Sequence, residues 1–118
     1  MMRSVFRAAA IGIVLTIWVL SLIPINQAVP GSDKLHHLAA YFACMWTWAQ
    51  VYAENRMRLR LAGAIVLMGA MVECVQWLVP WRSFDWADML ANALGVALAY
   101  FVAAGQAILA RRMQARTS

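Results

Sequence analysis

The stretch Glu73–Gly95, ECVQWLVPWRSFDWADMLANALG, sets polar side chains among strongly apolar neighbours. Its main polar positions are Glu73, Gln76, Arg82, Asp85, Asp88 and Asn92. Glu73 and Asn92 lie where the surrounding hydropathy indicates membrane hydrocarbon, and a carboxylate there costs roughly 2.5–3.5 kcal/mol on insertion scales. We therefore expect these side chains to have buried partners or a function, and the rest of the chain to hold them in place.

The composition of the chain indicates a membrane protein. Of its 118 residues, 64% are hydrophobic and 13% are charged, and the mean hydropathy is +0.67. A soluble domain has roughly 45–50% apolar and about 25% charged residues. The sequence pI is about 10.0, but the basic residues form short clusters between apolar runs, which is typical of a topology signal. Binding to nucleic acid is therefore not expected, and the length allows a single domain.

The order of apolar runs and helix breakers predicts an all-α, polytopic bundle of four transmembrane helices in one domain, residues 1–118. Proline ends the first and third runs, at Pro24 and Pro80, and a polar basic turn, Glu54–Arg60, separates the second run from the third. The predicted spans cover about residues 5–23, 34–52, 61–79 and 87–109. Ser32 or Asp33, after the first loop, is expected to cap the second helix.

The first apolar run, Ala8–Ile23, follows a short basic start and could be read as a signal peptide. Its apolar length exceeds the usual range of about 7–15 residues, and no clear small-x-small cleavage site follows it. We interpret it as a retained first span.

The distribution of basic residues predicts the orientation. Eight arginines fall on one side of a four-span topology, and two cations, Lys34 and Arg82, fall on the other. Cytoplasmic loops carry an excess of lysine and arginine. We therefore expect both termini and the middle turn in the cytoplasm, and the loops 24–33 and 80–85 outside, in a multi-pass membrane protein.

The polar residues of three predicted spans fall at matching depths, because a helix rises about 1.5 Å per residue. The layers below the outer face are a rim of Lys34, Arg82 and Asp85, a middle of His37, Gln76 and Asp88, and a floor of Tyr41, Glu73 and Asn92. Each helix also places its members on one face, as in the i, i+4, i+8 spacing of Asp33, His37 and Tyr41. We expect the faces to converge inside the bundle, since side chains facing lipid would lack partners.

These residues resemble the VanZ-like family of small bacterial membrane proteins. The resemblance covers about residues 32–105 and consists of three ordered motifs. They are D-K-x-x-H-x-x-x-Y (Asp33, Lys34, His37, Tyr41), E-x-x-Q (Glu73, Gln76) and R-x-x-x-x-x-D-x-x-x-N-x-x-G (Arg82, Asp88, Asn92, Gly95). The family's named member is linked to low-level teicoplanin resistance, and no biochemical activity is established for it. The resemblance thus implies a location in the bacterial cytoplasmic (inner) membrane, and a fold and a site without a known reaction.

The favoured function is an outward-facing polar pocket that binds or modifies a lipid-linked or headgroup-bearing component of the cell envelope. The candidate catalytic residues are Glu73, as general acid or base, with His37 and Asp88. The candidate binding residues are Lys34 and Arg82, which suit phosphate or carboxylate, with Asp33, Tyr41, Gln76 and Asn92. We expect Glu73 to lie within reach of Gln76, Asn92 and either a cation or His37.

The spacing of these residues matches no recognised metal signature, so no metal ligands are assigned. A divalent ion held by Asp33, His37, Glu73 and Asp88 is an open alternative. The cofactor, the oligomeric state and whether the chain is an enzyme are also left open. The expected partners are the lipid bilayer and a lipid or envelope-precursor ligand.

Two other functions compete with the polar pocket. The chain could be a structural or accessory protein whose polar network fixes helix packing and a partner surface. A proton-coupled transporter is disfavoured, because no ionisable residue is expected in the inner half of the membrane to continue a relay.

Overall fold

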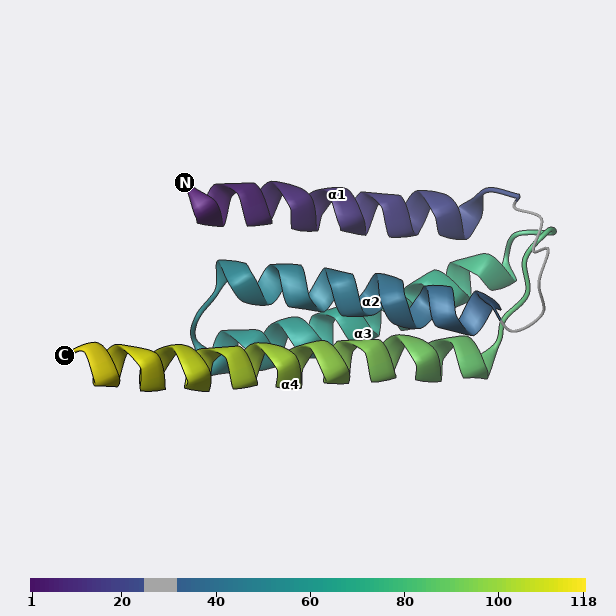
Figure 1. Ribbon diagram of the computed structural model, residues 1–118. Helices are drawn as coiled ribbons and strands as arrows, with labels where there is room; N and C mark the ends of the chain where they lie inside the picture. Colours follow the sequence, from purple (N-terminus) through teal and green to yellow (C-terminus); the bar gives the residue numbers. More distant parts are fainter. Residues whose placement is uncertain (25–31) are drawn as a thin grey trace.

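Four helices form the part of the chain that the computed structural model describes, residues 1–24 and 32–118. They are α1 (Met2–Leu22), α2 (Ser32–Val51), α3 (Asn55–Trp77) and α4 (Trp86–Thr117). The helices run alternately along one long axis, and both chain ends lie at the same end of the bundle (Figure 1). The described residues contain no strand. The prediction of an all-α membrane bundle of four helices is confirmed. The loop 25–31 lies outside the described residues, and Ser32 and Asp33, the predicted caps, lie in the first turn of α2.

Two helix boundaries differ from the predicted spans. α3 begins at Asn55 and so includes most of the predicted Glu54–Arg60 turn, and α4 continues to Thr117. Arg58 explains the short α2–α3 connection, because its guanidinium donates to the carbonyls of Ala49 (2.8 Å from Nη2) and Tyr52 (2.8 Å from Nε). Carbonyls in the last turn of a helix lack intrahelical donors, and a cation satisfies them well.

α2 is the central helix of the bundle. It packs most extensively against α4 and also contacts α1 and α3, and it lies beside α1 and α4 in Figure 1. Its buried face includes Tyr41, Cys44, Met45 and Ala49, each at most 2% exposed. α1, α3 and α4 are long and apolar enough to cross a membrane. α2 does not reach that hydropathy, because a helix surrounded by other helices has less need of apolar side chains for contact with lipid.

Glycine allows the close approach of α4 to α2. A Cβ atom at Gly95 would collide with the backbone of Leu38 and lie 3.0 Å from the backbone nitrogen of Phe42. Helices in membranes come together closely where small residues line the contact. Gly95 is therefore a position where α2 and α4 are in close contact.

The two ends of the bundle differ in chemistry. α2 begins and α3 ends at the end opposite the chain termini (Figure 1), and this end carries Lys34, Arg82 and the acidic residues near them. At the other end, α4 has 32 residues, about 48 Å of helix, which exceeds the roughly 30 Å of a hydrocarbon core. Its last turns, with Arg111, Arg112 and Arg116, therefore extend beyond the apolar part of the bundle.

Candidate functional site

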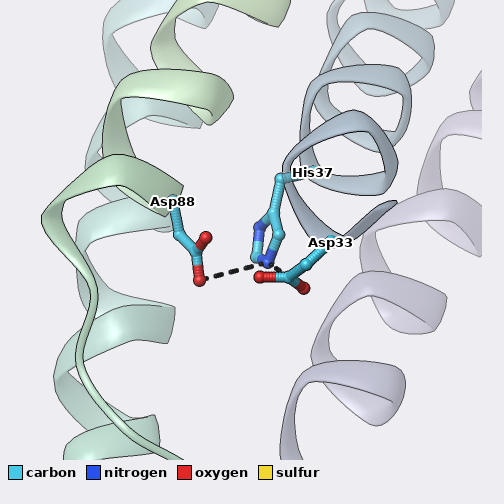
Figure 2. Close-up of side chains that lie close together, drawn as sticks. All are labelled: Asp33, His37 and Asp88. Atoms are coloured by element: carbon cyan, nitrogen blue, oxygen red, sulfur yellow. Dashed lines mark ion pairs between the residues drawn. The ribbon is translucent and has the colours of Figure 1, made fainter. Parts of the chain in front are cut away.

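His37 lies at the centre of a polar cluster between α2 and α4. Its Nδ1 is 3.0 Å from Oδ1 of Asn92, and its Nε2 is 3.4 Å from Oδ1 of Asp33 and 3.5 Å from Oδ2 of Asp88. Figure 2 shows both carboxylates turned toward the same ring nitrogen. Because an amide oxygen only accepts hydrogen bonds, Asn92 assigns the proton to Nδ1.

Lys34 joins α2 to the start of α4. Its Nζ contacts Oδ2 of Asp85 at 2.6 Å, Oδ2 of Asp33 at 3.5 Å, and Oδ1 of Asp88. An ammonium group has three N–H donors, so these three carboxylates occupy all of them. Lys34 is thus held among carboxylates, whereas the sequence predicted that it would bind an external anion.

Glu73 lies under this ion-pair layer and is fully buried, at 0% exposure. Its Oε2 accepts a hydrogen bond from the backbone nitrogen of Asp85 at 3.1 Å. Its Oε1 has no hydrogen-bond partner among the described residues. The sequence predicted a cation or His37 within reach of Glu73; the hydrogen bond described here comes from the backbone of Asp85, because the 78–85 loop returns over the end of α3.

Asp85 begins α4 and also pairs with Lys34. Its Oδ1 accepts a hydrogen bond from the backbone nitrogen of Ala87 at 2.9 Å, as an N-cap side chain does. The hydrogen bond from Lys34 is the main cause that lowers the pKa of the Asp85 carboxyl, and the bond from Ala87 adds to it. Asp85 therefore carries a negative charge at neutral pH.

Gln76 and Arg82 are directed to α1. Nε2 of Gln76 donates to the Ser21 carbonyl at 2.8 Å, and Nη2 of Arg82 donates to the Leu20 carbonyl at 2.7 Å. Arg82 also reaches the carbonyl of Ile23, and the indole of Trp81 donates to that of Leu22. These side chains satisfy carbonyls at the end of α1 that have no helical partner. Gln76 and Arg82 thus cap α1, whereas the sequence predicted that they would line the pocket with His37.

Tyr41 and Asn92 form the floor of the cluster against Gly69. A Cβ atom at Gly69 would lie 3.0 Å from Nδ2 of Asn92 and 3.2 Å from Cε1 of Tyr41. Both side chains are 2% exposed, and neither the Tyr41 hydroxyl nor Nδ2 of Asn92 has a hydrogen-bond partner among the described residues. Gly69 thus lets Tyr41 and Asn92 pack closely against α3, as expected of a small residue at a helix contact.

The sequence was compared with known protein families, curated proteins and solved structures. Residues 7–110 match the VanZ/LLP1 family. The chain belongs to this family. No curated protein matches the chain, and no solved structure does.

The VanZ motif residues divide into two groups in this structure. Asp33, Lys34, His37, Asp88 and Asn92 contact one another between α2 and α4. Glu73 joins this group through the backbone of Asp85, and Gly95 makes the approach of the helices sterically feasible.

Gln76 and Arg82 form the second group, the contacts to α1. Neither the contact of Trp81 with α1 nor that of the Asp85 backbone nitrogen with Glu73 was predicted from the sequence. The last carbonyls of any helix lack intrahelical donors, so the end of α1 could have been expected to attract donor side chains such as these.

Proposed function

We propose that this VanZ family member is a multi-pass protein of the bacterial cytoplasmic membrane that binds the headgroup of a lipid-linked envelope component. In this proposal the polar cluster lies at the outer face and both termini lie in the cytoplasm. Three helices that are apolar enough to cross a membrane support the membrane location. The arginine-rich end opposite the cluster supports the orientation, because cytoplasmic segments are enriched in basic residues.

The observation that carries this proposal is the graded exposure of the cluster. At the end of the bundle, the side chains of Lys34 and Asp85 are 38% and 44% exposed. Further in, the side chains of His37 and Asp88 are 15% and 10% exposed, and Glu73 is completely buried. A headgroup arriving from outside would thus meet the ion pairs first and His37 next.

Apolar side chains beside the cluster favour a ligand with a lipid tail. Leu35 on α2 is 66% exposed, and Trp86 and Leu90 on α4 are each 71% exposed. In a membrane these side chains contact acyl chains. A molecule that is both lipid and headgroup can place its tail against them while its polar part reaches the cluster.

The charges of the cluster favour a ligand with donor groups. This end of the bundle has more acidic than basic side chains. The four carboxylates are those of Asp33, Glu73, Asp85 and Asp88, and the two cations are Lys34 and Arg82. Both cations already contact acceptors inside the chain. Hydroxyl or amino groups of a headgroup can donate to the carboxylates, and an anionic group would require a further cation. His37, Glu73 and Asp88 are the groups positioned to exchange a proton with such a ligand.

The first test replaces carboxylates without changing their size. We expect Glu73→Gln and Asp88→Asn to fold as the wild type does and to lose both the co-purifying lipid and the phenotype. Because the family is linked to glycopeptide resistance, the phenotype to measure is the teicoplanin concentration that inhibits a susceptible host expressing the chain. Native mass spectrometry of the purified protein measures the bound lipid.

Glu54→Gln is the matched control for this test. Glu54 is an exposed carboxylate in the connection at the other end of the bundle, and its side chain makes no capping hydrogen bond. We expect this variant to behave as the wild type does. Retention of lipid and phenotype by both site variants would refute the proposal.

A structural role is the second candidate, and one set of contacts favours it. Gln76 and Arg82 connect the end of α3 to α1 by hydrogen bonds. Lys34 connects α2 to the start of α4 by ion pairs. If the polar network serves only packing, Glu73→Gln and Asp88→Asn will lower the melting temperature in proportion to any loss of phenotype. A loss of phenotype at unchanged melting temperature identifies a ligand site instead.

A further inference from the structure

The geometry points to a divalent metal site formed by Asp33 and His37 of α2 and Asp88 of α4, with zinc as the ion that fits the donor set. Each residue offers one ligand atom, and the three atoms lie within 4.8 Å of one another. Figure 2 shows the two carboxylates approaching Nε2 of His37 from different helices. One imidazole nitrogen with carboxylate oxygens is a combination that zinc accepts in proteins.

The distances fit a shared ion better than direct hydrogen bonds. Nε2 of His37 is 3.4 Å from the Asp33 oxygen and 3.5 Å from the Asp88 oxygen. Ligand atoms about 2.0–2.2 Å from a tetrahedral ion are about 3.3–3.6 Å from one another. A charge-assisted N–H to O bond would be about 2.7–2.9 Å long. The two nitrogen-to-oxygen distances are therefore those expected of ligands around one centre, and the two carboxylate oxygens lie within 4.8 Å of each other.

The orientation of His37 is the second observation, and it is independent of the carboxylates. Oδ1 of Asn92, a side chain 2% exposed, accepts the hydrogen bond of Nδ1. Neutral His37 therefore has its lone pair on Nε2, facing two carboxylate oxygens that also carry lone pairs. A metal ligand histidine is held in this way, with its other ring nitrogen donating to a fixed acceptor.

Lys34 holds the two carboxylates in position from the other side. It contacts Oδ2 of Asp33 and Oδ1 of Asp88, which leaves Oδ1 of Asp33 and Oδ2 of Asp88 directed at His37. Three carboxylates, those of Asp33, Asp85 and Asp88, contact a single cation, Lys34, so this part of the cluster has two more carboxylates than cations. One divalent ion would balance that excess.

Three protein ligands leave a fourth position of a tetrahedral ion for water or a ligand, as in catalytic zinc sites. Glu73 has a fully buried oxygen, Oε1, without a hydrogen-bond partner in the described part of the chain, and it belongs to the same cluster. It is a candidate acceptor for a water on the ion. That the fourth position holds a headgroup phosphate or hydroxyl rests on the proposed function; binding of the metal itself does not.

The test measures zinc on the full chain, purified in detergent with an affinity tag that contains no histidine. The protein is stripped with a chelator, dialysed against buffered Zn²⁺ and assayed for bound zinc by inductively coupled plasma mass spectrometry, with affinity from calorimetry. We expect one Zn²⁺ per chain. We expect His37→Gln, Asp88→Asn and Asp33→Asn each to bind at least about tenfold more weakly.

His36→Gln is the matched control, because His36 is the neighbouring histidine on α2 and is exposed. It should bind zinc as the wild type does. Circular dichroism checks that each variant keeps the helicity of the wild type. If His37→Gln does not fold, the zinc affinities of Asp33→Asn and Asp88→Asn decide the test. Absence of stoichiometric zinc from the wild type, or wild-type affinity in all folded ligand variants, would overturn the metal site. Loss of co-purifying lipid in Glu73→Gln with zinc retained would separate the two proposals.

Discussion

Asn92 accepts a hydrogen bond from Nδ1 of His37 over 3.0 Å, although the two residues are 55 positions apart in the chain. The contact joins α2 to α4 and fixes the rotation of the imidazole ring. It directs Nε2 toward Asp33 and Asp88. The orientation of one ring thus depends on the packing of two helices.

Asn92→Ala should therefore weaken zinc binding without removing a ligand. The loss of a partner that orients a metal ligand typically lowers affinity by about 10–100-fold, and calorimetry with Zn²⁺ measures this change. Asn55→Ala is the control, since Asn55 also makes a side-chain hydrogen bond, to the Tyr100 hydroxyl, but at the other end of the bundle. Equal zinc affinity in the two variants would show that Asn92 does not position His37.

Glu73→Gln and Glu73→Leu should differ in stability. Glutamine keeps an acceptor for the backbone nitrogen of Asp85, whereas leucine leaves that N–H unpaired, at a cost of about 1–3 kcal/mol. We expect the melting temperature in detergent to be unchanged or higher for Glu73→Gln and lower for Glu73→Leu. Equal melting temperatures for both variants would mean that the hydrogen bond to Asp85 does not stabilise the loop.

Gly95→Ala should loosen the contact between α2 and α4, because the added Cβ collides with the backbone of Leu38, which cannot rotate away. Gly63→Ala and Gly105→Ala are matched controls, since a Cβ at either position meets nothing within 4 Å. The controls should keep or raise the melting temperature, as alanine favours a helix by about 1 kcal/mol over glycine. A melting temperature of Gly95→Ala equal to the controls would contradict the close packing.

The ion pair between Lys34 and Asp85 should contribute a pH-dependent stability. The pKa of Asp85 is lowered from its ordinary value of 3.8, first by the hydrogen bond from Lys34. A lowered folded-state pKa stabilises the protein above the ordinary value, and the stabilisation disappears as the pH falls through the lowered pKa. Asp85→Asn retains a good N-cap residue but lacks the charge.

The measurement compares the melting temperatures of wild type and Asp85→Asn between about pH 7 and pH 3. We expect a constant advantage of the wild type above about pH 5 that shrinks below about pH 4. Glu54→Gln should show no such trend. An advantage that grows toward low pH would exclude the ion pair as its source.

Membrane orientation is tested by cysteine labelling in a background without Cys44 and Cys74. Ser83→Cys lies in the exposed 78–85 loop beside the cluster, and Ala53→Cys lies in the exposed α2–α3 connection at the other end. We expect a membrane-impermeant maleimide to label Ser83→Cys in intact cells and Ala53→Cys only after lysis. The reverse pattern would place the cluster in the cytoplasm and refute the proposed access from outside.

The sequence by itself determined the helices and the depth of their polar residues. Depth follows from a local property, the constant rise of a helix, counted from the outer helix ends at Asp33, Pro80 and Asp85. It was therefore possible to predict that His37, Asp88 and Asn92 would lie near the same end. Apolar length also predicted the four helices, although α2 proved to be an interior helix.

Only the tertiary structure decided which polar groups became partners. Gln76 and Arg82 have the predicted depth but bind carbonyls at the end of α1, and Lys34 is surrounded by carboxylates. These outcomes depend on the rotation of each helix about its axis and on the path of the 78–85 loop. Both are set by packing, such as the approach of α2 to α4 at Gly95, and no spacing within a single helix contains that information.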